Sequence, residues 1–250
     1  MLNILLCGCG GRMGAAVAAA AAAAGDRIVA GVDVNPVEAG PYPVFQSPEE
    51  FEGKADVMID FSHHSALGGL LDYAVRTGTP LVVCTTGHTE AQMAQMREAA
   101  QKAPIFFSRN MSLGINLLIS LCRRAAATLG EDFDIEIIEK HHNQKLDAPS
   151  GTALMIADAI CEGDEHPYVY DRHAVRRKRE RGEIGLHAVR GGNIVGEHDV
   201  LFCGQNETVT LSHSAASREV FATGALRAAR FMQGKGAGFY NMDDVIGEVL

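Results

Sequence analysis

The chain opens with an apolar segment, a cluster of glycines and a run of alanines: residues 1–25 read MLNILLCGCGGRMGAAVAAAAAAAG. Short apolar segments favour strands, glycine permits tight turns, and alanine is the strongest helix former. A strand, a glycine turn and a helix in this order direct backbone N–H groups and the positive end of the helix at a phosphate. The opening therefore predicts a nucleotide-binding βα unit at the start of a parallel sheet.

The glycine spacing is compatible with a dinucleotide-binding loop. Gly8, Gly11 and Gly14 match G-x-x-G-x-x-G, whereas the strict G-x-G-x-x-G pattern fails at Met13. Asp33 follows at about the 20-residue offset where an acid meets the adenosine ribose. A carboxylate there favours NADH because it repels the extra phosphate of NADPH. A tight strand-to-helix turn without a ligand is the alternative.

Strands and helices alternate along the first 111 residues, with a loop expected over 35–48. Such alternation predicts an α/β fold, a Rossmann-like doubly wound parallel sheet. The expected strands cover 2–8, 27–34, 55–61, 80–86 and 104–108, and the expected helices cover the alanine tract 15–24 and residues 65–77 and 89–102.

The pattern changes after residue 111. A long helix over 112–129 precedes a strand over 133–140 in which apolar and acidic residues alternate. A helix over 151–161 follows, and then three strands without helices between them, over 184–192, 194–202 and 207–214. These elements predict a smaller α+β domain with an antiparallel or mixed sheet. A helix over 218–232 and a glycine-rich tail end the chain.

Two loops follow expected parallel strands, at the edge where such sheets bind ligands. They hold the candidate cofactor residues Cys84, Thr85 and Thr86, and Ser108, Arg109, Asn110 and Met111. Ordinary capping of the next helix is the alternative for both. His63 and His64 also follow a strand, but no matching pair of ligands lies nearby in the sequence, so we expect no metal there.

Residues 139–152 read EKHHNQKLDAPSGT and concentrate titratable groups before a helix start. His141 and Lys145 are four residues apart, which places both on one face of a strand or of a helix. An imidazole beside an ammonium suits proton transfer to a substrate that gains electrons. Ser150, Gly151 and Thr152 offer N–H groups and hydroxyls at a helix N-terminus, which suits a carboxylate. A solvated surface turn remains equally compatible with these residues alone.

The string E-K-HH-NQ-K-L-DAPSGTA resembles the signature of the dihydrodipicolinate reductase family. The segments GCGGRMG, DFS, TTG, NMSLGIN and RGGNIVGEHDVLF also follow that family's order, over nearly the whole chain. The resemblance implies reduction of a cyclic dicarboxylate imine by hydride transfer from NAD(P)H, with loss of water, in lysine and diaminopimelate biosynthesis. The expected substrate partner is therefore a small dicarboxylate, and the expected assembly is a homotetramer.

The resemblance also implies roles for individual residues. His141 would be the general acid–base group and Lys145 the proton donor, while His142, Ser150, Gly151 and Thr152 would hold the substrate carboxylates. The cofactor would lie along Gly8, Cys9, Gly10, Gly11, Arg12 and Met13, with Asp33 on the ribose. Residues 1–111 and 217–250 would form a discontinuous dinucleotide-binding domain, and residues 112–216 the substrate-binding and oligomerisation domain.

Some positions depart from the family pattern or stay open. Cys84 stands where the family often has glycine. DFSHH replaces the usual arginine after DFT, which again favours NADH. Arg190 could meet a substrate carboxylate or point into solvent. For the basic stretch over 172–181 a solvated, mobile loop is favoured over nucleic-acid binding, because acidic residues surround it.

Composition narrows the class of protein further. A formal net charge of −9 argues against general affinity for nucleic acid or anionic membrane, and six scattered cysteines without a C-x-x-C pair suggest a reduced cytoplasmic protein. Two other readings stay open. One is a different two-domain nicotinamide dehydrogenase, for example one acting on aspartate or homoserine, and the other is a regulator that binds NADH without turnover.

Overall fold

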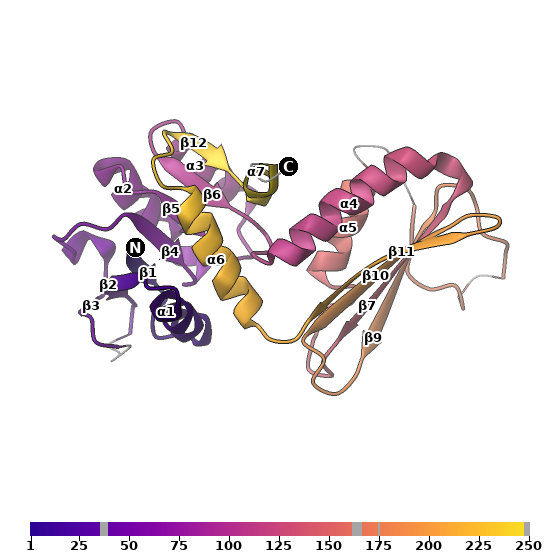
Figure 1. The fold of residues 1–250 in the computed structure, drawn as a ribbon, viewed down its shortest axis with the longest axis horizontal. Coiled ribbons are helices and arrows are strands. Elements are labelled where there is room, and N and C mark those ends of the chain that lie inside the picture. Colours follow the sequence, from indigo (N-terminus) through magenta and orange to yellow (C-terminus); the bar gives the residue numbers. More distant parts are fainter. Residues whose placement is uncertain (36–39, 162–166, 175, 248–250) are drawn as a thin grey trace. The chain divides into compact units, whose positions relative to one another are not determined.

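Figure 1 shows the computed structural model, which describes residues 1–35, 40–161, 167–174 and 176–247. The chain divides into two compact units, one of Met1–Leu113 with Glu219–Leu250 and the other of Gly114–Arg218. Each unit is built around its own sheet. The binding roles expected for the two sequence-defined domains remain predictions.

Within the described residues, the first unit holds a seven-stranded sheet of order β12-β6-β5-β4-β1-β2-β3, in which all pairs run parallel. The strands are β1 (Asn3–Cys7), β2 (Arg27–Val32), β3 (Val44–Phe45), β4 (Val57–Asp60), β5 (Leu81–Val83), β6 (Pro104–Phe107) and β12 (Gly238–Tyr240). The helices are α1 (Arg12–Ala23), α2 (Leu67–Thr77), α3 (Glu90–Ala99), α6 (Glu219–Phe231) and α7 (Met242–Gly247), with 3-10 turns η1 (Pro48–Glu50) and η2 (His64–Ala66).

Helices cover both faces of this sheet. Successive side chains of a strand point to opposite faces, so Ile4 and Leu6 pack in the core beneath α1 and α6, and Leu5 and Cys7 pack in the core beneath α2 and α3. All four side chains are buried. The alanine run forms α1 as expected, and Gly25 follows it with a φ of +75°. The predicted doubly wound sheet is therefore present.

The strand order reverses at β1, which lies between β2 and β4. Ligands of doubly wound sheets bind beyond the carboxyl ends of the strands at such a reversal. The loops after β1, β2, β5 and β6 carry the cofactor residues expected from the sequence. The sheet thus brings these loops to one edge.

Two parts of this sheet differ from the expectation. The segment expected as loop contains β3, whose two residues pair with Gly31 and Val32. The tail expected to be irregular adds β12 beside β6, followed by α7. Strands of two and three residues at sheet edges carry too few side chains for a periodic signal.

The second unit holds a mixed sheet of order β11-β10-β7-β9-β8 in its described part. Its strands are β7 (Asp134–His141), β8 (Tyr168–Val169), β9 (Ile184–Arg190), β10 (Gly196–Cys203) and β11 (Thr208–Ala215). Strand β10 runs antiparallel to β7 and β11, whereas β7, β8 and β9 are parallel to one another. This unit also contains α4 (Leu113–Leu129), the 3-10 turn η3 (Gly130–Asp132) and α5 (Gly151–Cys161).

Helices α4 and α5 supply the core of this unit. Ile115 and Ile119 of α4 and Ile156 of α5 pack with Ile137 of β7 and Phe202 of β10. The chain has no described helix that is long and apolar enough to cross a membrane.

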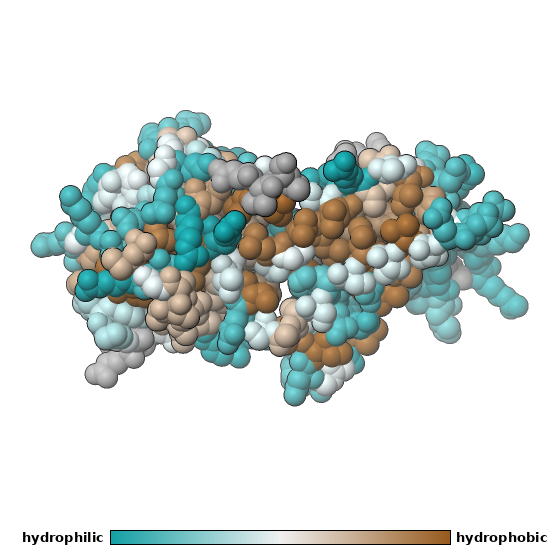
Figure 2. All heavy atoms as spheres, in the orientation of Figure 1, coloured by the Kyte–Doolittle hydropathy of each residue, from teal (hydrophilic) through white to brown (hydrophobic). Residues whose placement is uncertain are grey.

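The outer side of α4 is apolar as well (Figure 2). Leu117 and Leu121 are each 44% exposed. Leucines four residues apart lie on one side of a helix, so they form an exposed apolar strip on this unit.

Candidate active site

Gly8 brings the glycine loop against the turn after β4. Its φ is +74°, and a Cβ atom at this position would lie 2.5 Å from the Phe61 carbonyl oxygen. A Cβ atom at Gly14 would lie 2.4 Å from the Gly8 carbonyl oxygen, whereas at Gly11 the nearest such neighbour is 3.4 Å away. The first and third glycines are therefore required by close backbone contacts where the strand order reverses.

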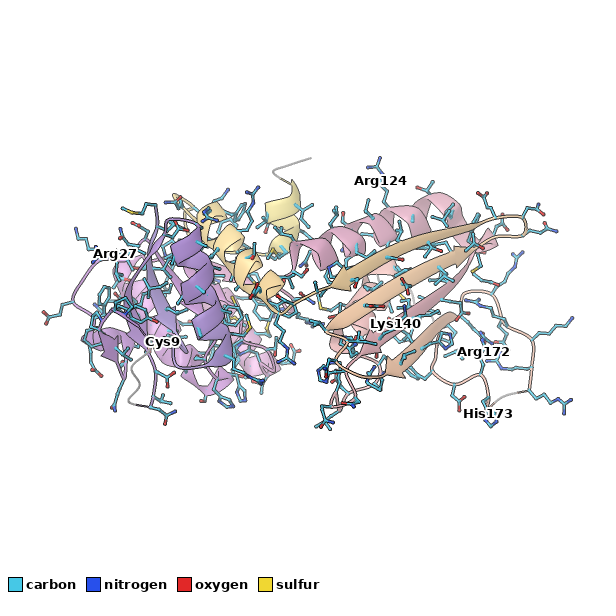
Figure 3. All side chains as sticks on the ribbon, turned by 60° about the horizontal axis from the view of Figure 1, so that its bottom comes forward. Cys9, Arg27, Arg124, Lys140, Arg172 and His173 are labelled. Carbon is cyan, nitrogen blue, oxygen red and sulfur yellow. The ribbon has the colours of Figure 1, made fainter. Side chains whose placement is uncertain are left out.

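The N-terminus of α1 follows this loop. Its N-cap residue, Gly11, has no side chain to cap the helix, and Arg12 is exposed while Met13 is half-buried. Open N–H groups and the positive helix end fit the pyrophosphate of a dinucleotide. Cys9 offers only its backbone to such a group, because its side chain is buried beside Gly31 (Figure 3).

Asp33 lies beside the glycine loop at the end of β2. One carboxylate oxygen accepts a hydrogen bond from the Gly10 N–H at 3.0 Å, and the other accepts one from the Asn35 N–H at 3.0 Å. The side chain is half-exposed. This is the position from which an acid reaches the ribose hydroxyls of a dinucleotide.

The loop after β5 forms part of a cavity at the same edge. Cys84 and Thr85 are buried and Thr86 is exposed. Burial raises the pKa of the Cys84 thiol well above its usual range, so the thiol stays protonated. The cavity has a volume of about 250 Å³ and is lined by Phe61, Ser62, His63, His64, Cys84, Thr85 and Thr86.

Asp60, which the sequence did not single out, holds two residues of this cavity in place. The Thr85 hydroxyl donates to its carboxylate at 2.9 Å, as do the Ser62 N–H at 2.9 Å and the Ser62 hydroxyl. Asp60 is 1% exposed. Burial raises the pKa of this carboxyl, although the hydrogen bonds from Ser62 and Thr85 act in the opposite direction.

The loop after β6 is an ordered turn. The Ser108 hydroxyl donates to the Asn110 carbonyl oxygen at 2.8 Å. Met111 is buried, and α6 packs directly on it, since a Cβ atom at Gly224 would lie 1.7 Å from the Met111 carbonyl oxygen. Arg109 is exposed.

In the second unit, β7 ends in a buried acid–imidazole pair. His141 Nδ1 lies 2.6 Å from Glu139 Oε2, and the Glu139 side chain is fully buried. Arg190 donates two hydrogen bonds to the same carboxylate, at 2.8 and 2.7 Å. The sequence left open whether Arg190 meets a substrate carboxylate or points into solvent. Its main contact is instead the Glu139 carboxylate.

The charges of this pair follow from its surroundings. Burial acts to raise the pKa of Glu139, but the hydrogen bonds from Arg190 and His141 outweigh it and lower that pKa. Burial lowers the pKa of His141, Glu139 counteracts part of this, and Lys145 and Arg190 lower it further. A charged carboxylate therefore faces an imidazole that is mainly neutral at neutral pH.

Ser150 connects this pair to the start of α5. Its N–H donates to Glu139 Oε1 at 3.0 Å, and its hydroxyl accepts from the Ala153 N–H at 3.1 Å. The same hydroxyl lies 3.2 Å from His198 Nε2. Ser150 is thus a buried N-cap, which places the next two residues, Gly151 and Thr152, in the first turn of the helix.

Lys145 lies in the loop between β7 and α5. Because β7 ends at His141, the argument that His141 and Lys145 share a face of one strand or helix is wrong. The two are still near enough for Lys145 to lower the pKa of His141. Lys145 Nζ pairs with Asp147 Oδ1 at 2.9 Å, and Arg190 donates to the Asp147 carbonyl oxygen at 2.6 Å, so the loop is tied to β9.

His142 directly follows β7. It is half-buried, and its Nε2 lies 3.5 Å from Arg218 Nη2. Gly151 is exposed and Thr152 is half-buried at the helix start. The second unit therefore gathers the proposed proton-transferring and carboxylate-binding residues around β7 and the N-terminus of α5.

Two family models match the chain. The model described as dihydrodipicolinate reductase, N-terminus, matches residues 2–111, and that described as dihydrodipicolinate reductase, C-terminus, matches residues 114–246. The chain belongs to the dihydrodipicolinate reductase family. The matches cover both compact units, so the assignment does not rest on the nucleotide-binding fold alone.

Curated relatives and a solved structure agree with this assignment. The 4-hydroxy-tetrahydrodipicolinate reductase of Caldanaerobacter subterraneus subsp. tengcongensis is 51% identical over 251 residues and covers 98% of each chain. That of Clostridium botulinum (strain Eklund 17B / Type B) is 50% identical and covers 99% of each chain. A dipicolinate-bound dihydrodipicolinate reductase from Paenisporosarcina sp. TG-14 has a TM-score of 0.81 and 26% identity, covering 96% of this chain and 97% of that one.

These findings confirm the predicted family, fold class and enzyme class, an NAD(P)H-dependent reductase of lysine and diaminopimelate biosynthesis. The roles of the individual site residues remain predictions. Among the described residues of this reductase, no group of three or more histidine, cysteine or acidic side chains could hold a metal ion. His63 Nδ1 instead accepts a hydrogen bond from the Ser65 N–H and caps a 3-10 turn.

The basic stretch of the reductase differs from the expected solvated, mobile loop. Arg172 and Arg177 both pair with the buried Glu183 carboxylate. Arg179 pairs with Glu136 at 3.1 Å and also donates to backbone carbonyl oxygens. The expected solvation is wrong for Arg172 and Arg179, which are half-buried beside partners on β7 and just before β9, whereas Arg177 is exposed although it is paired. The mobility of the stretch stays a prediction, and residue 175 lies outside the described residues.

Glu139, Asp60 and His198 are site residues that sequence reasoning missed. Glu139 is two residues before His141 on a strand, so the alternation of strand side chains could have placed both on one face. Alternating apolar and acidic residues are typical of a half-exposed strand, and yet the Glu139 side chain is fully buried. Asp60 ends a fully buried strand, and an acid in such a place was the available signal.

Proposed function

We propose that this protein reduces the cyclic imine formed from 4-hydroxy-tetrahydrodipicolinate, with loss of water, to tetrahydrodipicolinate, and that His141 and Lys145 manage the protons. One observation carries this proposal. The buried Glu139 carboxylate binds both the His141 imidazole and the Ser150 N–H. A proton-transferring group and a helix N-terminus that attracts anions are therefore joined by one side chain. That combination suits an anionic substrate which gains a hydride and a proton.

The substrate carboxylates would be held by His142, Ser150, Gly151 and Thr152. The first N–H groups of α5 and its positive end favour an anion. The Ser150 hydroxyl already caps the helix and the Gly151 backbone hydrogen-bonds to the Asp147 carboxylate, so a substrate carboxylate would join an anion that this helix start already attracts. The dipicolinate bound to the relative from Paenisporosarcina sp. TG-14 supports a small cyclic dicarboxylate.

Proton transfer would use His141 as the general acid–base group and Lys145 as the proton donor. Because Glu139 holds Nδ1, Nε2 is the imidazole nitrogen left for the substrate. Lys145 carries three donors on a flexible stem, and its pairing with Asp147 keeps it in the loop before α5. Its positive charge also complements a dicarboxylate.

The cofactor would lie along Gly8 to Met13 and supply the hydride when bound. Cys84, Thr85 and Thr86 and residues Ser108 to Met111 would flank its nicotinamide end. NADH is the preferred coenzyme in this proposal, since Asp33 stands at the ribose position and its neighbours Val34 and Asn35 are uncharged. NADPH would be used less well, and no metal would be needed.

The second unit would also assemble the protein into a homotetramer. It exposes the apolar side chains of Leu117, Leu121 and Val189, which an interface between subunits would cover. We place the enzyme in the cytoplasm, with a small dicarboxylate rather than nucleic acid or membrane as its partner. Sedimentation of the purified chain would measure the assembly state.

A coupled assay tests the proposal. The substrate is made fresh from pyruvate and aspartate semialdehyde by the preceding synthase, and coenzyme oxidation is followed with NADH and with NADPH. Oxidation that needs both the synthase product and this protein is the expected result. If neither coenzyme is oxidised while NADH still binds, the proposal is wrong and a regulator that senses NADH becomes the better reading.

Variants separate the proton-handling residues from the fold. His141→Gln and Lys145→Ala should each lower kcat on the order of 100-fold and leave NADH affinity unchanged, because positioned proton transfer contributes about 10²–10⁴-fold. His173→Gln is the matched control, since His173 is exposed in the same unit. Unchanged kcat in both variants would remove these residues from the mechanism.

A further inference from the structure

Four hydrogen-bond donations converge on the carboxylate of Glu139. His141 Nδ1 lies 2.6 Å from Oε2, and the Ser150 N–H donates to Oε1 at 3.0 Å. Arg190 Nη1 donates to Oε2 at 2.8 Å and Nη2 to Oε1 at 2.7 Å. Each carboxylate oxygen thus accepts from Arg190 and from one element of the proposed active site.

This geometry selects one tautomer of His141. An ionised carboxylate can only accept hydrogen bonds, and the Arg190 guanidinium keeps Glu139 ionised. A neutral imidazole at His141 must therefore carry its proton on Nδ1. Its Nε2 is then an unprotonated acceptor, and in the described part of the chain no protein group donates to it.

The surroundings of the ring leave Nε2 accessible. A Cβ atom at Gly196 would lie 3.1 Å from Nε2, so glycine at this position of β10 keeps that side of the ring free of a side chain. The His198 ring lies edge-on to the His141 ring, with 5.3 Å between centroids. The charged groups around the imidazole are Glu139 on β7, Arg190 on β9, and Lys145 with its partner Asp147 on the loop.

We propose that Glu139 is a positioning residue for the reduction: it fixes His141 as the Nδ1–H tautomer, with Nε2 directed to the substrate, and links this ring to the anion-binding start of α5 through Ser150. In this assignment Arg190 does not bind substrate; it neutralises and orients Glu139. The inference rests on the proposed function, because it names the atom of His141 that exchanges the proton.

The competing explanation is a buried ion pair with a structural role. A structural Glu139–Arg190 pair would stabilise the fold without affecting the protonation of His141. A positioning role predicts a change at His141 as well. The Glu139 carboxylate raises the pKa of His141, whereas burial, Lys145 and Arg190 lower it. Loss of the Glu139 charge should therefore move the titration of the His141 imidazole to lower pH.

The first test needs no variant and no substrate. Long-range ¹H–¹⁵N spectra of the ¹⁵N-labelled full chain report which imidazole nitrogen carries the proton, and His141→Gln identifies the His141 signals. The expected result is protonated Nδ1 and unprotonated Nε2 at pH above the imidazole titration. A His141 protonated on Nε2 in the wild type would overturn the proposal.

The second test removes the charge of Glu139. In Glu139→Gln we expect a mixture of His141 tautomers, an imidazole titration at lower pH, and a kcat reduced on the order of 100-fold. The limb of the pH–kcat profile that His141 sets should shift in the same direction. Glu139→Asp, which keeps the charge on a shorter stem, should restore part of kcat and of the titration.

Glu197→Gln is the matched control. Glu197 lies on β10 in the same sheet and pairs with Lys140 near the surface, so its loss removes one carboxylate without touching His141 (Figure 3). It should leave the His141 spectrum and kcat unchanged. A Glu139→Gln variant that loses kcat equally at every pH, with the wild-type tautomer and titration, would assign Glu139 a structural role only.

The two proposals fail in different ways. A wild-type protein that oxidises neither coenzyme with the synthase product refutes the proposed function, whatever the spectra show. A wild-type protein that is active but has His141 protonated on Nε2 refutes only the positioning role of Glu139. Binding of NADH by every variant confirms that the first unit stayed intact.

Discussion

The Asp33 carboxylate accepts a hydrogen bond from the Gly10 N–H at 3.0 Å, although the two residues are 23 positions apart in the chain. The contact ties the end of β2 to the glycine loop after β1. It also holds an acid at the place where the adenosine ribose would bind. The coenzyme preference proposed above depends on this relationship.

Asp33→Asn should therefore change coenzyme preference. The amide keeps the size of the side chain but loses the charge that binds ribose hydroxyls and repels a phosphate. Since a hydrogen bond to a charged group contributes about 1.5–3 kcal/mol, we expect KM for NADH to rise about tenfold or more, while KM for NADPH falls. Initial rates with each coenzyme measure both values.

Glu52→Gln serves as the control for Asp33, because it removes one exposed carboxylate from the same unit. It should leave the ratio of the two KM values unchanged. An unaltered ratio in Asp33→Asn would contradict the ribose assignment.

Gly8 and Gly25 allow the cost of a positive φ to be separated from that of a steric clash. Their φ values are +74° and +75°, but a Cβ atom would meet the Phe61 backbone at Gly8 and no atom within 4 Å at Gly25. Gly25→Ala should cost about 1–2 kcal/mol of unfolding free energy, the penalty for this backbone region. Gly8→Ala should cost more and also weaken NADH binding.

Urea unfolding and fluorescence titration with NADH check both variants. Equal stability losses, together with unchanged NADH affinity in Gly8→Ala, would show that the contact between the glycine loop and Phe61 has no part in cofactor binding.

His198 should make the protein sensitive to acid. Burial lowers its pKa from 6.5 to about 4, and His141, His213 and Lys145 lower it while Glu139 opposes them. Between about pH 4 and pH 6.5 the unfolded chain binds a proton at this histidine and the folded protein does not. The contribution of neutral His198 to the free energy of unfolding is therefore complete above about pH 6.5 and is lost as pH falls toward 4. The loss is at most about 3 kcal/mol.

Unfolding free energies of the wild type and His198→Gln, at about pH 7 and about pH 4.5, test this expectation. The difference between the two pH values should be smaller in His198→Gln than in the wild type, whatever the absolute stability of the variant. His173→Gln, at an exposed site, should keep the wild-type difference. The same pH dependence in all three proteins would mean that His198 titrates normally.

Glu183 should protect the basic stretch from proteolysis. Its buried carboxylate pairs with Arg172 and Arg177 and thereby ties the basic stretch to the start of β9. In Glu183→Gln both arginines lose their charged partner, so trypsin should cut within residues 172–181 several-fold faster. Mass spectrometry of early digests locates the cuts.

Glu180→Gln is the comparison for Glu183, since Glu180 pairs with Arg177 while 68% exposed. Exposed ion pairs contribute little, so its digestion should resemble that of the wild type. Equally slow cleavage of Glu183→Gln would show that other contacts hold the segment.

Patterns that are local in the chain could be read correctly without coordinates. The strand, glycine turn and alanine helix at residues 1–25 specify a βα unit because each residue type acts through its own backbone preference. The alternation of strands and helices then specifies a parallel sheet. The signature around His141 and Ser150 identified the family because its residue types and spacing are unusual.

The contacts of the candidate site were decided by tertiary structure. Glu139 meets Arg190, Ser150 meets His198, and Asp60 meets Thr85, each across strands or loops distant in sequence. Whether a charged side chain is solvated or buried depends on the partner that pairing of strands brings beside it. For the basic stretch, the acids around it are visible in the sequence, but the burial of Glu183 and the position of Glu136 beside Arg179 are visible only in the folded sheet.

Short edge strands were decided in the same way. The two residues of β3 and the three of β12 are too few for a periodic signal, although Val, Phe and Tyr favour strands, and the edge of the sheet supplies the partners that order them. The chain alone determined which chemistry is present and which elements carry it. Only the folded structure determined which groups are charged, which are buried, and which nitrogen of His141 is left free.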